Sequence, residues 1–180
     1  DLEREIRKII EEAKKELERV NDEIRRIIEE MRRRSEESNK RIREIIERAR
    51  RRLEELIRRG VPKEDVERVL EEAIRRVEEL LKESRRILEE VIKRVDKLLK
   101  DSERILKRVE DLVRELLRRV DTEEVKKLLT DLKRLVDEIR KHNKRLLDEL
   151  RKEVEKSERE NRRLLEEVRR TVDEMRERAR

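Results

Sequence analysis

The stretch from Val69 to Thr122 reads VLEEAIRRVEELLKESRR, ILEEVIKRVDKLLKDSER and ILKRVEDLVRELLRRVDT, which are three units of 18 residues (69–86, 87–104 and 105–122). The same period runs through 6–59 and through 128–180, where the final unit is one residue shorter. Eighteen residues make five whole turns of an α-helix at about 3.6 residues per turn. Each apolar residue of one unit therefore returns to the same helix face in the next unit.

This period predicts the shape of the helices. A seven-residue repeat imposes a left-handed supercoil and an 11-residue repeat a right-handed one. An 18-residue repeat imposes neither, so we expect nearly straight helices with little supercoil. The apolar stripe spans roughly 100° between Ile6 and Val20 and roughly 140° between Val69 and Leu81, at about 100° per residue. A stripe of this width suits a helix that faces two neighbours.

Two short segments separate the periodic stretches. Gly60 and Pro62 are the only glycine and proline, and they stand where one helix would end and the next begin. Asp121, with Glu124 three residues later, fits an N-cap that opens a capping box. We expect helices near 2–59, 63–120 and 122–179, each about 87 Å long at 1.5 Å per residue. The predicted fold is all-α, an antiparallel up-down-up three-helix bundle forming a single domain over 1–180.

The composition excludes several classes of site. Charged residues make up 59% of the chain, and the chain contains no cysteine, no aromatic residue and one histidine. A thiol nucleophile and a cysteine-based metal centre are therefore excluded. No apolar run approaches the roughly 18–20 residues of a membrane span. Basic runs at 32–34 and 50–52 are flanked by glutamates, and no aromatic side chain is present to stack on a base, so we expect solvated faces and no nucleic acid partner.

Some positions of the apolar stripes are polar, and antiparallel packing aligns them. The first turn makes facing residue numbers of the first two helices add up to about 122, and the second turn makes those of the last two add up to about 242. Two polar layers are then expected about 27 Å apart, one repeat along the helix. The first layer contains Asn21, Ser102, His142 and Asn143, and the second contains Ser35, Ser38, Asn39, Ser84, Ser157 and Asn161.

We interpret these positions as two buried, connected hydrogen-bond layers. A buried polar group without a partner costs roughly 1–3 kcal/mol, so a shift in register that placed Asn or Ser against Leu would be penalised. The layers would therefore give packing specificity. Asn143, Asn161, Ser84 and Ser102 are expected to sit centrally, with Asn21 and Asn39 near the rim. In the alternative interpretation the polar side chains lie at the stripe edges and face water.

No chemistry beyond this is predicted. Ser102 beside His142 superficially resembles a nucleophile and its base, but catalysis also needs an orienting carboxylate, an oxyanion hole and a cleft. Glu138 and His142 are the only candidate metal ligands, and their spacing of four lacks the paired motif of helical metal sites. We therefore expect no catalytic residue, no metal site and no cofactor. A buried His142 would make its layer sensitive to pH.

The repeat units, the GVPKED (60–65) and VDTEE (120–124) junctions and the aligned Ser and Asn positions resemble de novo designed helical bundles. More narrowly, the chain resembles long parametric three-helix bundles that carry hydrogen-bond networks. Natural spectrin-like repeats are the nearest alternative, but those carry heptads and a buried tryptophan.

The resemblance implies a very stable, rigid scaffold that is not an enzyme and has no natural localisation. Such a protein would be soluble and would remain in the cytoplasm on recombinant expression. We expect a monomer that requires no partner. The alternative is a designed interaction module, either a subunit of a helical-bundle oligomer or an acceptor of a partner helix, which the wider stripe of 63–120 favours.

Overall fold

The computed structural model describes residues 2–179, which form three α-helices and no strand. Helix α1 comprises Leu2–Arg58, α2 comprises Lys63–Arg119 and α3 comprises Glu123–Arg178. All three carry glutamate or aspartate in the first turn and arginine in the last turn, which complements the helix dipole. The predicted all-α three-helix bundle is confirmed, and the helix ends differ from the expected ones by one residue at most.

The turn between α1 and α2 follows from Gly60. Its φ is +68°, a conformation that glycine adopts without steric cost. The Gly60 N–H donates to the Ile57 carbonyl at 3.1 Å, and the Val61 N–H donates to the Leu56 carbonyl at 3.3 Å. These two bonds are the Schellman pattern, which satisfies the last carbonyls of α1. The Pro62 carbonyl then accepts from Asp65 and Val66, so α2 begins directly after Pro62.

The turn between α2 and α3 corrects one expectation. The first helical bond of α3 runs from the Lys126 N–H to the Thr122 carbonyl at 3.1 Å, which makes Thr122 the N-cap. Asp121 was predicted for that position and lies one residue too early. The sequence offers two adjacent capping residues, and only the backbone geometry distinguishes them.

Side-chain contacts fix the directions of the helices. Between α1 and α3 the bonded residues are 121 to 124 positions apart, as in Asn21 with His142 and Ser35 with Ser157, so these helices run parallel. Between α2 and α3, Ser102 bonds Asn143 and Ser84 bonds Asn161, and the two residue numbers add up to 245 in both cases. A constant sum means that α2 and α3 are antiparallel. The expected values were an offset of 120 and a sum of 242.

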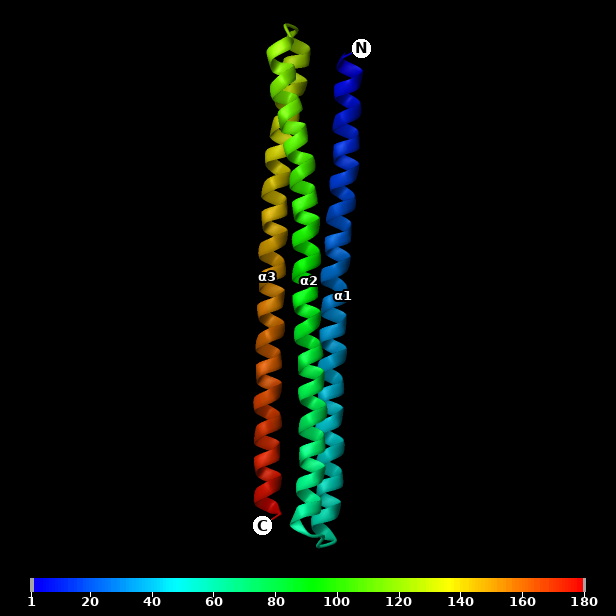
Figure 1. Cartoon of the computed structure of the whole chain (residues 1–180), viewed down its shortest axis with the longest axis vertical. Coiled ribbons are helices and arrows are strands. Elements are labelled where there is room, and N and C mark those ends of the chain that lie inside the picture. Colours follow the sequence, from blue (N-terminus) through cyan, green and yellow to red (C-terminus); the bar gives the residue numbers. More distant parts are fainter. Residues whose placement is uncertain (1, 180) are drawn as a thin grey trace. The chain divides into compact units, whose positions relative to one another are not determined.

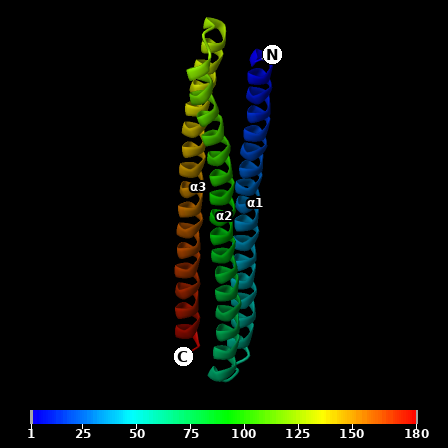
Figure 2. The same ribbon diagram turned by 45° about the horizontal axis from the view of Figure 1, so that its top comes forward.

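The contacts group the chain into two compact units through which all three helices pass. Unit 1 consists of Asp1–Glu29 and Val91–Arg151, and unit 2 consists of Glu30–Glu90 and Lys152–Arg180. Within each unit the segments of α1, α2 and α3 run alongside one another, as the ribbons of Figure 1 and the turned view of Figure 2 show. The single domain over 1–180 and the straightness of the helices stay predictions.

Each unit buries an apolar core to which all three helices contribute. In unit 1 the core includes Ile6, Leu17, Leu106, Val113, Leu129 and Val136. In unit 2 it includes Ile42, Leu53, Leu70, Val77, Leu164 and Val168. Leu70, Leu88 and Leu106 are spaced by 18 and all are buried, as are Val77, Val95 and Val113. The sequence thus returns the same position to the core in three successive 18-residue repeats, as five whole turns require.

Candidate functional site

The Ser102 layer (Asn21, Ser102, His142 and Asn143) lies in unit 1. The Asn143 side-chain amide donates to Ser102 Oγ at 2.8 Å, which joins α3 to α2. His142 Nε2 lies 2.7 Å from Asn21 Oδ1, which joins α3 to α1. Because an amide oxygen only accepts, the Nε2 nitrogen of His142 carries the proton in this bond. The layer therefore consists of two hydrogen-bonded pairs that radiate from adjacent residues of α3.

The Ser84 layer (Ser35, Ser38, Asn39, Ser84, Ser157 and Asn161) lies in unit 2. The Asn161 amide donates to Ser84 Oγ at 3.1 Å across α2 and α3. Ser35 Oγ and Ser157 Oγ share a bond of 3.3 Å across α1 and α3. The structure thus brings together the same helix pairs as in the Ser102 layer, again with α3 as the common element.

Asn39 and Ser38 behave differently from the expectation. The Asn39 amide donates to Glu160 Oε2 at 3.2 Å, and Glu160 is a partner that the sequence reasoning missed. Asn39 occupies the position of Asn21 one repeat later, and Glu160 occupies that of His142, so the 18-residue period held the signal. The buried Asn39 Oδ1 has no hydrogen-bond partner among the described residues. Ser38 is half-buried, and no side-chain hydrogen bond links it to the other described residues of the layer.

The direct hydrogen bonds of each layer form separate pairs, and a connected network stays a prediction. Within the described chain, no hydrogen bond joins the His142 pair to the Asn143 pair, and none joins α1 directly to α2. The reason is the reach of the side chains. A serine on α2 is short and is met by the longer asparagine of α3, which uses its amide N–H for that bond.

Burial also differs from the expectation. Ser102 and Ser84 are buried, with exposed fractions of 0% and 4%, and Ser157 is buried as well. Asn143 and Asn161, which were expected to be central, are only half-buried, as are Asn21, Asn39 and His142. The longer side chains leave part of their surface in water, while the short hydroxyls occupy the core. Each amide therefore reaches inward from the rim to satisfy a buried serine.

The position of the Ser–Asn pairs in the repeat sets them apart. One repeat beyond Ser102 and Asn143 stand Val120 and Val125, and one repeat beyond Ser84 and Asn161 stand Val66 and Ala179. Val120, Val125 and Val66 are buried, and Ala179 packs against the core of unit 2. The same pairing position is thus apolar in the two outer repeats and polar in the two inner ones.

The geometry does not assemble a catalytic pair. The Ser102 hydroxyl is fully buried and accepts from Asn143, while His142 is bonded to Asn21. A substrate cannot reach a hydroxyl with no exposed surface, so Ser102 has no access to act as a nucleophile. Among residues 2–179, no group of three His, Cys, Asp or Glu side chains is arranged to hold a metal ion.

Ion pairs between helices flank the layers. Arg140 on α3 holds Glu103 at 2.9 Å and also contacts Glu110, both on α2. The hydrogen bond to Glu103, followed by the bond to Glu110, raises the pKa of Arg140 above its ordinary value. Arg32 on α1 lies 2.9 Å from Glu153 on α3, and this bond lowers the pKa of the Glu153 carboxyl. Such exposed pairs each contribute only about 0–1 kcal/mol, so they orient helices more than they stabilise them.

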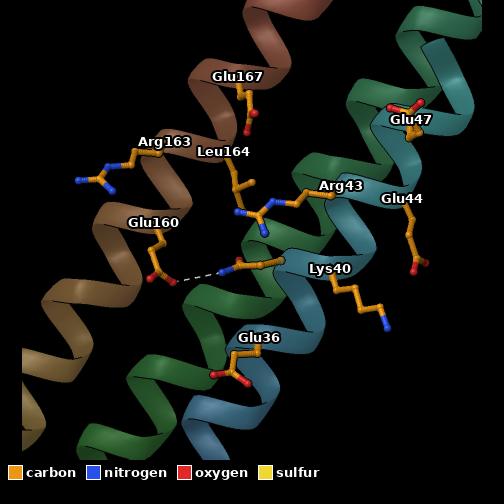
Figure 3. Close-up of a pocket in the computed structure, with 10 residues that line it drawn as sticks. Glu36, Lys40, Arg43, Glu44, Glu47, Glu160, Arg163, Leu164 and Glu167 are labelled. Carbon is orange, nitrogen blue, oxygen red and sulfur yellow. Dashed lines mark hydrogen bonds between the residues drawn. The ribbon is translucent and has the colours of Figure 1, made fainter.

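A groove of about 810 Å³ runs between α1 and α3 in unit 2. It is lined by five glutamates, three basic residues, Asn39 and Leu164. Figure 3 shows Arg43 and Glu160 on opposite walls, with Leu164 between the two helices. The mixed charges of the walls and a single apolar side chain in the lining make this a solvated furrow between two charged helices.

None of the described helices has the length and apolar character needed to cross a membrane.

No protein-family model matches the chain, and no curated protein matches it. Among solved structures, the chain is similar to one described as a "Computationally designed three helix bundle", with 22% identity and a TM-score of 0.30. That similarity covers 97% of this chain and 86% of the other.

Proposed function

We propose that the chain is a designed, rigid three-helix scaffold without a natural biochemical activity, and that its polar pairs specify how the helices pack. The single observation that carries this proposal is the repeated Ser–Asn pair. Ser102 with Asn143 and Ser84 with Asn161 use the same atoms across the same helices at a constant sum of 245. Valine and alanine fill the same position in the outer repeats, so the packing accepts apolar residues there.

A specificity role follows from the cost of an unmatched polar group. If α3 shifted along α2 by three or four residues in one direction, Ser84 would face Leu164 or Leu165 and Ser102 would face Leu146 or Leu147, and both serines would lose their partners. Each buried hydroxyl would then cost roughly 1–3 kcal/mol. An all-apolar seam imposes no such penalty and tolerates several registers. The pairs therefore select one register without adding much net stability.

The absence of enzymatic activity rests on access and chemistry. Ser102, the serine predicted to lie beside His142, is fully buried, and its hydroxyl already accepts a hydrogen bond from Asn143. Backbone N–H groups inside the helices are bonded within the helix, so they offer no oxyanion hole. We further propose a monomer that needs no partner, since each unit already buries apolar residues from all three helices.

The test replaces the inner pairs by the residues of the outer repeats. In the variant S84V/S102V/N143V/N161A the four positions take the identities of Val66, Val120, Val125 and Ala179. We expect a thermal midpoint equal to or above that of the original chain, because apolar burial replaces a near-neutral hydrogen bond. After refolding at high concentration, light scattering should detect associated species in addition to the monomer, whereas the original chain should give a single monomeric peak.

The matched control is R86E/E155R, which changes exposed residues of α2 and α3 and leaves the pairs in place. It should refold to a single monomeric species. If the four-residue variant is as monodisperse as the original chain, the polar pairs do not provide specificity. If it unfolds at a much lower midpoint, their role is to stabilise.

A designed interaction module is the second candidate, and one observation favours it. Ile92 and Leu117 are 44% and 38% exposed, and they lie on α2, whose apolar stripe is wider than that of α1. Sedimentation of the original chain separates the two candidates. A 22.4 kDa species at all concentrations supports the scaffold. A defined multiple that returns to 22.4 kDa in the variant I92E/L117E supports the module.

A further inference from the structure

The flank between α2 and α3 carries ion pairs at a fixed register. Arg140 lies 2.9 Å from Glu103 in unit 1, and Arg176 lies 2.7 Å from Glu67 in unit 2. In both pairs the two residue numbers add up to 243. Glu67 and Glu103 are separated by 36 residues, which is two repeats, so the two pairs occupy equivalent positions on the same helix faces.

The repeat between them has the opposite arrangement of charge. The equivalent positions are Arg85 on α2 and Glu158 on α3, both exposed, and their numbers also add up to 243. Along this flank α2 therefore presents Glu, Arg and Glu, while α3 presents Arg, Glu and Arg. Every charge meets its opposite only in the register in which the paired residue numbers add up to 243.

A shift by one whole repeat is the error that the period itself invites. Such a shift leaves one repeat of each helix unpaired. Where the helices still overlap, however, two of the three leucines Leu70, Leu88 and Leu106 return to the same place in the 18-residue pattern of α3, so the overlapping core does not reveal the shift. It also keeps one Ser–Asn match, Ser102 with Asn161. On the flank, however, it sets Glu103 against Glu158 and Arg85 against Arg176. A shift in the other direction sets Arg85 against Arg140 and Glu67 against Glu158. Both directions bring like charges together, which is unfavourable.

We propose that this alternating charge is a register code that rejects pairing shifted by 18 residues, including pairing with α3 of a second copy of the chain. The proposal rests on the proposed function for its purpose, which is a unique packing. Its residues are separate from the Ser–Asn pairs. The partner that the code excludes is a second copy that exchanges α3, since a domain-swapped arrangement frees the helices from the short turns.

Two cysteine reporters distinguish the registers in the full chain, which has no cysteine of its own. Ile74 and Arg169 line one groove between α2 and α3 in unit 2, and their numbers add up to 243 as in the ion pairs, so I74C/R169C probes the native register. Ile92 is the equivalent of Ile74 one repeat along α2, about 27 Å away along the helix. A disulfide requires Cα atoms within about 7 Å, so a disulfide between positions 92 and 169 forms only when the pairing is shifted by one repeat.

The decisive variant makes the code uniform. R85E/E158R keeps opposite charges in the native register but gives Glu on α2 and Arg on α3 in all three repeats, so the shifted register is matched as well. Each reporter is placed in the original and the uniform background, refolded at high concentration in a thiol buffer and analysed on a non-reducing gel. We expect the amount of disulfide-linked dimer formed by I92C/R169C to be on the order of fivefold higher in the uniform background. In the shifted register of that background, the contacts of 103 with 158 and of 85 with 176 join opposite charges, whereas in the original chain they join like charges.

R86E/E155R is the control, because it exchanges the same charges at exposed positions outside the code. It should leave the I92C/R169C dimer at its original level, and I74C/R169C should verify native folding in every background. Equal dimer in the original and uniform backgrounds refutes the code, as does abundant shifted dimer in the original chain. The polar-pair variant S84V/S102V/N143V/N161A is assayed alongside, so a failure of the packing role of those pairs is seen separately.

Discussion

Replacing the Ser102–Asn143 pair stepwise separates the cost of an unmatched group from the value of the pair. Ser102 is fully buried and its hydroxyl accepts the Asn143 amide at 2.8 Å. In N143V the hydroxyl loses that partner without access to water, which costs roughly 1–3 kcal/mol. In S102V the amide is stranded, but Asn143 is half-buried and can turn toward solvent, so the loss should be about 1 kcal/mol.

The double variant S102V/N143V should recover these losses. Val120 and Val125 occupy the same pairing position one repeat away and are buried there, which indicates that two valines fit. The double variant should unfold with a free energy equal to that of the original chain or above it, so the coupling between the two sites should be at least about 2–4 kcal/mol, the sum of the two single losses. The assay is denaturant unfolding followed by circular dichroism at 222 nm, with unchanged slopes in all four proteins. A double variant whose loss equals the sum of the single losses would refute the reasoning.

Three further predictions use the same unfolding assay. L106A removes a buried side chain and should cost about 2–5 kcal/mol, whereas I92A, at a 44% exposed position, should cost less than about 1 kcal/mol. Equal losses would contradict the packing described. G60A should cost about 1–2 kcal/mol from its positive φ alone, because a Cβ at Gly60 meets no atom within 4 Å, and G60N should cost less. The Arg32 bond lowers the folded-state pKa of Glu153, so its contribution of about 0.2–1 kcal/mol is complete above about pH 4.3 and is lost as the pH falls through the lowered pKa. E153Q should remove that part of the acid dependence, and an unchanged profile would show that the pair contributes nothing.

The sequence determines the helices because their signals are local. A single Gly and a single Pro mark the first turn, and the 18-residue period marks the apolar faces, so element order, direction and approximate register could be predicted. The ends of α2 and α3, Arg119 and Glu123, add up to the expected 242, whereas the bonded Ser–Asn pairs add up to 245, a difference of less than one helical turn. Such differences of one to three residues depend on backbone dihedrals, which residue types alone do not fix.

The polar layers show where such prediction ends. Residue spacing placed Ser84 near Asn161 and Ser102 near Asn143, and the structure joins both pairs. It could not show that the serines would be buried and the asparagines half-exposed, because that depends on side-chain length and rotamer. Glu160 does not stand out by residue type on a charged surface, and only its place one repeat after His142 marks it as the partner of Asn39.

The central claim is that five whole turns per repeat keep every pairing position on one face of its helix. Distance measurements by pulsed electron paramagnetic resonance test this claim directly. Spin labels on cysteines at 67 and 176, at 85 and 158, and at 103 and 140 probe the same flank in three successive repeats. If the helices are straight, with 3.6 residues per turn, the labelled positions face each other in the same way in every repeat, and the three distance distributions coincide. A heptad-type supercoil, at 3.5 residues per turn, would rotate each helix by about 51° per repeat, and the distances would then change steadily from the first label pair to the third.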